Sequence, residues 1–345
     1  MIEIDGGQQS GSGTIVRFAV AFSTLCGRGI HLVNARTRRA RPGLRPQHVA
    51  AVRACGELCG AVMEGVEVGS RELVFRPGKR IRGGCYRWDI GTAGSASMLA
   101  LGVLPVACLA DAPLSARITG GLFQDFSPSP FHLRHVLAPL VGRMGASVEL
   151  EVLRPGYVPA GAGLLELRVR PAAQGLVALA LRDPGSVRAV RGIALASHLA
   201  ERHVSERMAR ACEEVLGGEG LSCVIERVDD ATAARAGAGL AVWAETTTGC
   251  LLGADRAGAP RRSSEAIGRY VARALLEEVA SGATVDRHLA DQIVLFAALA
   301  RGATRYRAPA ESDHLRTNLW LAERFGARTH RDGSWIEVDG LGLRR

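Results

Sequence analysis

Apolar residues follow two different spacings along the chain, one typical of helices and one typical of short strands. Runs with apolar residues three or four positions apart predict helices, because such positions share one face of a helix. These runs lie at 13–26, 45–60, 94–110, 130–145, 289–301 and 314–325. Short apolar or alternating runs at 2–5, 85–90 and 176–182 favour strands. Helices and strands therefore alternate, and we expect a mixed α/β (α+β) fold.

One arrangement of elements occurs three times in the sequence. A helical run ends in Gly-Ala and is followed by strand-like segments, with the Gly-Ala pairs at 60–61, 145–146 and 326–327 and the strand-like segments at 72–75, 164–169 and 335–338. The first two copies are 85 residues apart and the last two are 181 residues apart. Such self-similarity is typical of repeated structural units. Each unit is strand, helix, strand, helix, strand, strand, so we predict a core of three βαβαββ units.

The longer spacing predicts an inserted domain. It exceeds one repeat by 96 residues, the size of a small domain. We place the insert at 185–282, between the leading strand and the first helix of the third unit, and the triplicated core at 1–184 and 283–345. The insert has its own α/β pattern, with strands at 189–194, 222–227 and 240–246 and helices at 200–216 and 264–279.

Composition narrows the class of protein. The 345 residues include 43 Lys or Arg against 34 Asp or Glu, a net charge of +9, and 47% are hydrophobic, as in ordinary globular proteins of about two domains. The eight cysteines lack metal-binding spacing, so we expect reduced core thiols, with Cys55 and Cys59 buried on one helix. The acidic start, 1–5, does not suit a secretory signal, and the apolar run 98–110 is too short to span a bilayer. We therefore expect a cytoplasmic protein without a membrane partner.

A glycine-rich turn between the first strand and the first helix is the first candidate site. It runs from Asp5 to Gly13, with Arg17 one helical turn further on. Backbone N–H groups at such a helix start can bind phosphate, although the turn can equally be only a tight connection. A similar turn at 89–95 in the second unit strengthens the case for an anion.

Five arginines precede the second helix and form a second candidate site. They lie at 36–45. They could grip phosphates of a triphosphate or of RNA, or they could be an ordinary solvated face. With only eight Phe, four Trp and four Tyr, a long base-stacking platform is poorly supported, and recognition of a strand end fits better. Lys79 is the only lysine, which argues against a lysine nucleophile and against a P-loop.

His314 is the candidate nucleophile. It lies in the first turn of a predicted helix, where the helix dipole disfavours imidazolium and keeps the ring neutral. His48 and His132 lie at comparable positions near the corresponding helices, so capping and packing are the alternative explanation. The stretch His288 to Gln292 opens another helix, and the carboxylate of Asp291 suits a metal ion or an orienting hydrogen bond.

These segments together resemble the RNA 3′-terminal phosphate cyclase family, and the resemblance covers essentially the whole chain. The matching motifs are Asp5-Gly-x-Gln8 with Gly13-x-x-x-Arg17, Ala40-Arg-Pro-Gly-Leu44 with Gln47-His48, Arg82-Gly-Gly-x-Tyr-Arg87, Ile90-Gly-x-Ala-Gly-Ser95, Leu289-Ala-Asp-Gln292 and His314-Leu-x-Thr-Asn318. No single motif is decisive, but their order and spacing together are specific.

The resemblance implies both an architecture and a reaction. The core would be similar to that of enolpyruvyl transferases, and the insert would be thioredoxin-like. An RNA 3′-phosphate would be converted to a 2′,3′-cyclic phosphodiester with ATP and a divalent cation, Mg or Mn, through a covalent His-AMP intermediate and an RNA-adenylate. The residues that this assigns are the catalytic His314, the ATP-binding His288, Leu289, Ala290, Asp291 and Gln292, the phosphate- or RNA-binding Arg17, Arg36, Arg39, Arg41 and Gln47, and Asp291 as a metal ligand.

The chain departs from the family pattern at several positions. Ser10 stands where an acidic residue associated with the metal is usual, Leu101 replaces a glutamine of the nucleotide site, and His288 replaces an aromatic residue. The family's triple glycine reads 161–163 with a central alanine. The alternative hypothesis is therefore a catalytically weakened, cyclase-like protein that binds RNA without chemistry. An enolpyruvyl-type transferase shares only the repeat architecture and lacks the lysines for its phosphate contacts.

Overall fold

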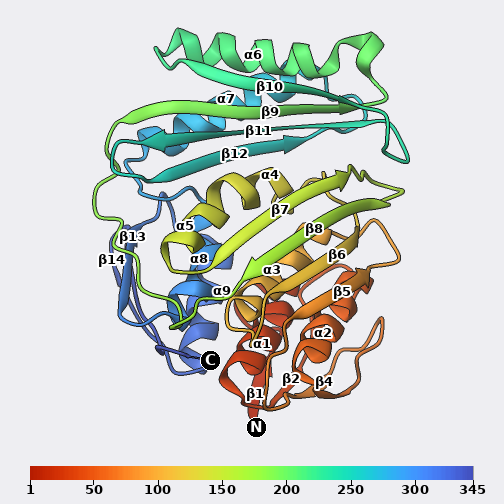
Figure 1. Cartoon of the computed structure of the whole chain (residues 1–345), viewed down its shortest axis with the longest axis vertical. Helices are drawn as coiled ribbons and strands as arrows, with labels where there is room; N and C mark the ends of the chain where they lie inside the picture. The colour runs from red at the N-terminus through yellow and green to blue at the C-terminus, as the bar shows by residue number, and fades with distance from the viewer. Residues whose placement is uncertain (345) are drawn as a thin grey trace.

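The N-terminal part of the chain forms a four-stranded sheet and two helices. The computed structural model describes residues 1–344 (Figure 1). The strand order is β1-β2-β4-β3, with β1 and β2 parallel and the other pairs antiparallel. The elements are β1 (Ile2–Asp5), α1 (Gly13–Cys26), β2 (Ile30–Val33), α2 (Pro46–Cys59), β3 (Val62–Glu64) and β4 (Leu73–Arg76). A parallel pair needs a crossover, which α1 provides. The α1 helix begins where the Ser12 hydroxyl accepts the Thr14 N–H and ends at Gly27, which adopts a left-handed conformation.

The second sheet repeats this order and these strand directions as β5-β6-β8-β7. Its elements are β5 (Gly84–Asp89), α3 (Ala96–Ala107), β6 (Leu114–Gly120), α4 (Pro130–His132), the π-helical turn η1 (Leu133–Leu137), α5 (Ala138–Arg143), β7 (Ser147–Arg154) and β8 (Gly163–Arg170). The helix predicted at 130–145 is therefore not a regular α-helix. Pro139 has no N–H to donate to the preceding turn, and this accounts for the local change in hydrogen bonding.

The third sheet has the order β13-β15-β14 and is antiparallel throughout. Its elements are α8 (Leu289–Leu299), β13 (Ala303–Arg307), α9 (Asp313–Arg324), β14 (Arg328–Asp332) and β15 (Trp335–Asp339). The prediction of a leading strand at 176–182 was wrong, because this segment does not form a regular strand. Only two isolated parallel bridges form, Val177 with Arg301 and Ala180 with Arg305. The four residues 177–180 thus face the five residues 301–305, and the left-handed Gly302 lies within the longer side.

The fourth sheet, at the top of Figure 1, belongs to residues 187–280, which we call the β9–α7 segment. The strand order is β10-β9-β11-β12. Its elements are β9 (Val187–Ser197), the short 3-10 helix η2 (Ala200–Arg202), α6 (Val204–Gly218), β10 (Cys223–Asp230), β11 (Gly237–Thr246), β12 (Leu251–Ala257) and α7 (Ser264–Ala280). The sequence pattern had not indicated β12.

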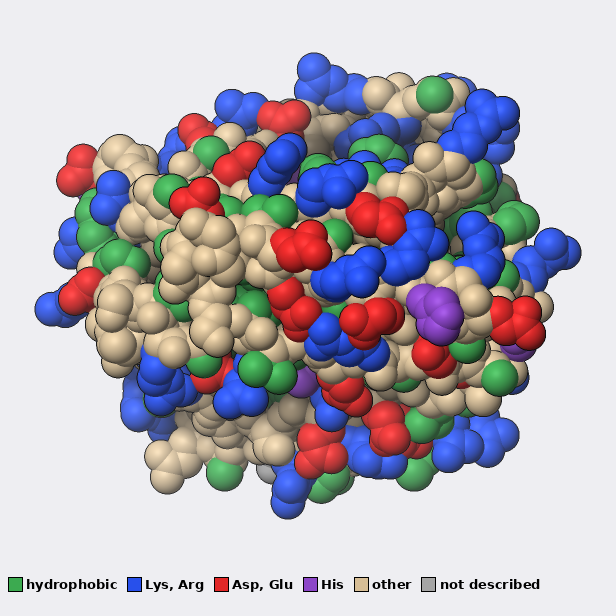
Figure 2. Space-filling view, turned by 90° about the horizontal axis from the view of Figure 1, so that it is seen from above, with side chains coloured by type: hydrophobic (Ala, Val, Ile, Leu, Met, Phe, Trp, Pro, Cys, Tyr) green, Lys and Arg blue, Asp and Glu red, His purple; other side chains and the backbone are tan. Residues whose placement is uncertain are grey.

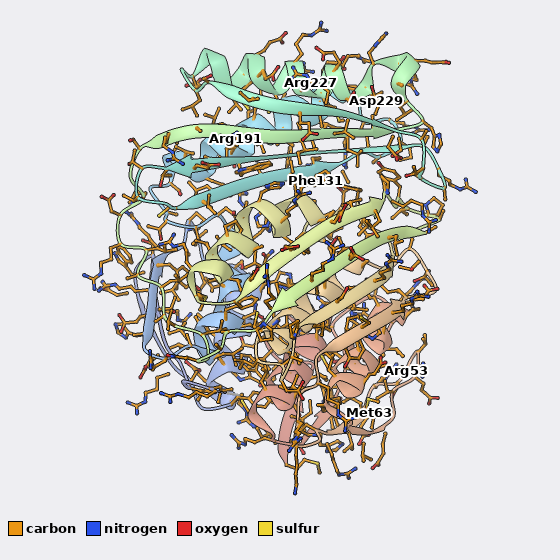
Figure 3. The ribbon with its side chains drawn as sticks, viewed as in Figure 1. Arg53, Met63, Phe131, Arg191, Arg227 and Asp229 are labelled. Atoms are coloured by element: carbon orange, nitrogen blue, oxygen red, sulfur yellow. The ribbon has the colours of Figure 1, made fainter. Side chains whose placement is uncertain are left out.

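The two faces of the fourth sheet pack into different cores. Along β9, Ala194 and Ala196 join a cluster under α6 and α7, whereas Ile193 and Leu195 join the large core of the other three sheets. This follows from the two-residue alternation of strand side chains. Phe131 lies at the boundary between the two regions (Figure 3), with its ring centroid 5.2 Å from that of Phe123. The β9–α7 segment is therefore attached to the rest of the chain through apolar contacts.

The opposite surface of this segment carries both charge signs. Seen from above, acidic and basic side chains are interspersed (Figure 2). Arg227 there pairs with both Glu206 and Glu213. On the face that Figure 2 shows, the two charge signs are therefore mixed rather than separated into a patch of one sign.

The structure bears on two expectations from composition, the burial of the cysteines and the short length of the apolar runs. Cys55 and Cys59 are buried, as predicted, but Cys85 is exposed on β5, so the expectation of core thiols was wrong for that residue. Within residues 1–344, no helix combines the length and apolar character needed to cross a bilayer.

Candidate nucleotide and RNA-end site

A cavity of about 430 Å³ lies where the main core meets the β9–α7 segment. This volume falls within the range of small-molecule sites. Its lining comes from α1 (Thr14, Arg17, Phe18), α3 (Met98, Leu101), the loop before α4 (Gln124, Asp125, Phe126, Ser127, Pro128), α4 (His132), the end of β12 (Asp255, Arg256, Ala257), α7 (Tyr270), the start of α8 (His288, Asp291, Gln292) and the start of α9 (His314). Segments from across the sequence thus meet at one cavity.

His314 is positioned by the start of α9 and by α1. The hydroxyl of Ser312 caps the helix by accepting the Leu315 N–H at 3.0 Å. The His314 Nδ1 atom lies 3.3 Å from the Thr14 hydroxyl oxygen. Burial lowers the pKa of His314 below its ordinary value, and the nearby Arg17 and Arg39 charges lower it further, against a smaller opposing effect of Asp313. The imidazole is therefore neutral near pH 7, with Nε2 as the nitrogen not directed at Thr14.

Arg17 is a buried cation without adequate partners. Its exposed fraction is 4%. Its Nη2 lies 3.5 Å from the Thr14 hydroxyl, whereas Nε and Nη1 have no hydrogen-bond partner. Burial, with a contribution from the Arg36 charge, lowers the pKa of Arg17 to about 10, so the group stays charged at neutral pH. A buried charge with unused donors is costly, and an anionic ligand would satisfy it.

The carboxylate of Asp286 organises the start of α8. One oxygen accepts the His288 and Leu289 N–H groups at 2.9 and 2.8 Å. The other accepts the Gly253 N–H of β12 at 2.8 Å and lies 3.0 Å from Nε2 of His132. This single side chain therefore joins α8, α4 and the β9–α7 segment beside the cavity. Although it is fully buried, the His132 charge and these hydrogen bonds hold the pKa of Asp286 at about 2.

The predicted ATP-binding stretch divides into two groups. His288, Asp291 and Gln292 line the cavity, and Gln292 has a buried side-chain oxygen without a partner. Leu289 and Ala290 are buried in the core and do not line the cavity, so the structure does not bring their side chains to the site.

Asp291 does not form part of a preformed metal site. Burial and the Asp286 carboxylate raise the pKa of Asp291 to about 8, so it is largely protonated at pH 7 and a poor cation ligand. In residues 1–344, no group of three or more His, Cys, Asp or Glu side chains is arranged to hold a metal ion. Ser10 instead contacts the Ser12 hydroxyl at 2.9 Å. The unpartnered guanidinium nitrogens of Arg17 suit the phosphates of a nucleotide.

The other predicted phosphate ligands lie outside the cavity lining. Arg36 donates to the backbone oxygens of Arg41 and Gly43, at 2.8 and 2.7 Å, and so folds its own loop. Arg39 and Arg41 are exposed. The Gln47 side-chain oxygen accepts the Ser95 N–H at 2.9 Å and so joins α2 to the start of α3. Two of this group act on the cavity through their charge, Arg36 on Arg17 and Arg39 on His314.

The two comparison histidines have packing roles. His48 Nδ1 accepts the Arg45 N–H at 3.0 Å at the start of α2. His132 pairs with Asp286. Capping accounts for His48, which lies outside the cavity lining. His132 lines the cavity together with His314, but its Nε2 is already engaged by Asp286.

Sequence reasoning missed several lining residues. Thr14, which lines the cavity, and Asp286, which supports the lining from behind, carry weak local signals, being a polar residue in a first helical turn and an acid just before a helix start. Asp255, Arg256 and Tyr270 carry no such signal, because only the docking of the β9–α7 segment brings them to the cavity.

A family model described as RNA 3′-terminal phosphate cyclase matches residues 8–331. The chain belongs to this family. A protein of Methanopyrus kandleri named RNA 3′-terminal phosphate cyclase is 39% identical over 94% of this chain and 93% of its own length. One of Methylococcus capsulatus with the same name is 39% identical over 94% and 91%, and one of Pyrobaculum aerophilum is 35% identical over 100% and 99%.

Among solved structures, the enolpyruvyl transferase NikO from Streptomyces tendae superposes with a TM-score of 0.42 and 11% identity. The match covers 99% of this chain and 50% of that chain. This likeness is too low to add to the cyclase family assignment.

Proposed function

We propose that this chain converts an RNA 3′-terminal phosphate to a 2′,3′-cyclic phosphodiester at the expense of ATP, with His314 as the nucleophile. The observation that carries the proposal is the meeting of His314 with the unpartnered guanidinium of Arg17 in a cavity also lined by His288, Asp291 and Gln292. A neutral imidazole beside an unsatisfied cation suits attack on a phosphate, because the cation offsets the repulsion of the anionic phosphorus centre.

The reaction proceeds in three steps whose bonds balance. Nε2 of His314 forms a bond to the α-phosphorus of ATP, and pyrophosphate leaves. An oxygen of the RNA 3′-phosphate then attacks that phosphorus, which frees His314 and gives an RNA-adenylate. The vicinal 2′-hydroxyl attacks the 3′-phosphorus, loses its proton to solvent, and AMP leaves. The adenylate step supplies a good leaving group, and the last step is favourable because it is intramolecular.

Thr14 and Arg17 prepare the first step. When His314 donates its Nδ1–H to the Thr14 hydroxyl, Nε2 keeps the lone pair needed for attack. Arg17 Nη2 contacts the same hydroxyl, while its Nε and Nη1 remain for phosphate oxygens. ATP enters as its complex with Mg²⁺ or Mn²⁺, and no residue of this chain is assigned to that ion.

We propose that the chain has a triplicated core, 1–184 and 283–345, and an inserted unit at 185–282. The family resemblance implies that this unit is thioredoxin-like. The matching strand orders β1-β2-β4-β3 and β5-β6-β8-β7 support the repeat, as do the two parallel bridges before β13. The separate apolar cluster beneath α6 and α7 supports the insert. A cytoplasmic location stays an expectation from the sequence.

Self-adenylation tests the proposal. The protein is incubated with ATP labelled at the α-phosphate and a divalent cation, and then run on a denaturing gel. Label should survive denaturation in the wild type and in His330→Ala, a control at an exposed histidine on β14, and should be absent in His314→Ala. A second assay follows the conversion of 3′-phosphorylated RNA to a phosphatase-resistant end.

A second candidate function is RNA binding without chemistry. Ser10 in place of an acidic residue and the lack of a preformed metal cluster in residues 1–344 favour it. Tight binding of 3′-phosphorylated RNA by a wild type that never takes up label would establish this alternative.

A further inference from the structure

Exposed aromatic side chains are concentrated at the cavity. The chain has eight Phe, four Trp and four Tyr. Among residues 1–344, only Phe126 and Tyr270 have exposed rings, with Phe126 fully exposed and Tyr270 48% exposed. Both line the cavity that holds His314. An isolated exposed apolar residue is ordinary, but the location of both exposed rings at one polar cavity indicates a binding role.

The loop that carries Phe126 is fixed on both sides of the ring. Asp125 receives two hydrogen bonds from the guanidinium of Arg262, at 3.0 and 2.9 Å. The Ser127 hydroxyl accepts from Ser95 at 3.1 Å, and the Ser129 N–H donates to Asp255 at 3.1 Å. Phe126 itself has a φ of 65°, a left-handed conformation that is rare for a bulky residue. The anchored loop therefore holds the ring in solvent rather than letting it fold into the core.

Tyr270 presents its ring beside a cation. The Arg256 guanidinium carbon lies 3.9 Å from the centroid of the Tyr270 ring, and the Arg256 Nε is buried without a partner. Stacked rings and guanidinium groups are the side chains that bind unpaired nucleobases and their phosphates. Arg256 covers one face of Tyr270, whereas the ring of Phe126 is fully exposed and offers the larger free surface for stacking.

We propose that Phe126 stacks on one of the last two bases of the RNA substrate, with Arg256 and Tyr270 bordering the strand where it leaves the cavity. This inference rests on the proposed function. The polar groups for a mononucleotide, Arg17, Gln292 and His314, are partly or wholly buried, whereas Phe126 projects into solvent. A small nucleotide can lie within the cavity, but an RNA chain must cross the rim. One ring provides stacking without base-specific hydrogen bonds, so the subsite tolerates any base.

The test combines a protein change with an RNA change. Wild type, Phe126→Ala and Phe126→Trp are each titrated with a short 3′-phosphorylated RNA by fluorescence anisotropy. The same RNA is also used with the terminal or the penultimate base removed. The control is Val224→Ala, which truncates an exposed apolar side chain on β10 that does not line the cavity. KM values for RNA and for ATP are measured in parallel.

Phe126→Ala should weaken RNA binding about 5- to 150-fold and should change the KM for ATP by a much smaller factor. Phe126→Trp should restore affinity, and Val224→Ala should match the wild type. With the wild type, one of the abasic RNAs should bind more weakly by the same factor. With Phe126→Ala, the same RNA should show no further loss of affinity, because the effects of removing two groups that touch are not additive.

Two results would overturn the inference. An increase in the KM for ATP with unchanged RNA affinity would assign the ring to the adenine, and additive losses for ring and base would show that they do not touch. Absence of self-adenylation in the wild type would refute the proposed reaction, while the anisotropy measurements would still decide the stacking contact. The two failures are therefore distinguishable.

Discussion

Arg17 and the loop at 36–41 were both predicted to bind phosphate, but the structure places them in opposite environments. Arg17 is buried, lines the cavity and leaves two guanidinium nitrogens without partners. Arg36 uses its guanidinium on backbone oxygens of its own loop, and Arg41 is exposed. A folded chain tolerates an unsatisfied buried cation only at a cost, whereas an exposed one is satisfied by water. The comparison shows that the environment of an arginine is a better guide to its role than its membership of a basic cluster.

The largest expected effect is at Arg17. Arg17→Met should lower the rate of self-adenylation about 100- to 1000-fold, the usual consequence of removing a group that stabilises transition-state charge. The same change should leave the midpoint of thermal unfolding unchanged or higher, because it removes an unsatisfied buried charge. Rates from labelled ATP and a thermal melt check the two parts. A variant that unfolds at much lower temperature would show that Arg17 is a structural residue.

The next effect concerns the hydroxyl that faces His314. Thr14→Val keeps the shape of the side chain but removes the partner of His314 Nδ1, so self-adenylation should slow about tenfold to a hundredfold as the reactive tautomer becomes less favoured. Thr14→Ser keeps the hydroxyl and should retain most of the wild-type rate. Equal losses in both variants would mean that packing of the methyl group, rather than the hydrogen bond, sets the rate.

The pH dependence of self-adenylation should report on both arginine regions, because Arg17 and Arg39 both act on the pKa of His314. The pKa of His314 is lowered by burial and by the Arg17 and Arg39 charges, so the self-adenylation rate should stay on its plateau down to pH 6.5 and fall only at more acidic pH. Arg39→Ala removes one cation, favours imidazolium, raises the pKa of His314 and should shift the acidic limb to higher pH. An unshifted limb in Arg39→Ala would remove the exposed loop from any role at the cavity.

The smallest effects belong to the loop itself. Arg36→Ala should lower the free energy of unfolding by about 1–3 kcal/mol, because it removes two charged hydrogen bonds to backbone oxygens. Arg41→Ala should change the equilibrium constant for unfolding by less than twofold, as is usual for exposed sites. It should also change the KM for RNA by less than twofold. A large increase in the KM for RNA with Arg41→Ala would restore the prediction of an arginine grip on the strand.

Local patterns were sufficient for most elements but not for the way in which distant segments meet. The predicted helix 13–26 coincides with α1, and Arg17 and His314, both predicted as site residues, line the same cavity. The segment predicted as a helix at 130–145 is helical from 130 to 143, but its π-helical turn at 133–137 was not predicted, because apolar spacing does not register the hydrogen bond that Pro139 removes. Phe126 and Tyr270 could not be assigned, since their exposure and proximity depend on tertiary packing.

The bonds of Asp286 make one part of the fold depend on another. Its carboxylate receives the N–H groups of Gly253, His288 and Leu289 and pairs with His132. The conformation of the first turn of α8 is therefore coupled to the docking of β12 beside α4. A shortened version of the protein without residues 187–280 would leave this carboxylate short of donors and the nucleotide-facing turn unsupported. Attempts to engineer a minimal catalyst should retain that segment even though it contributes neither His314 nor Arg17.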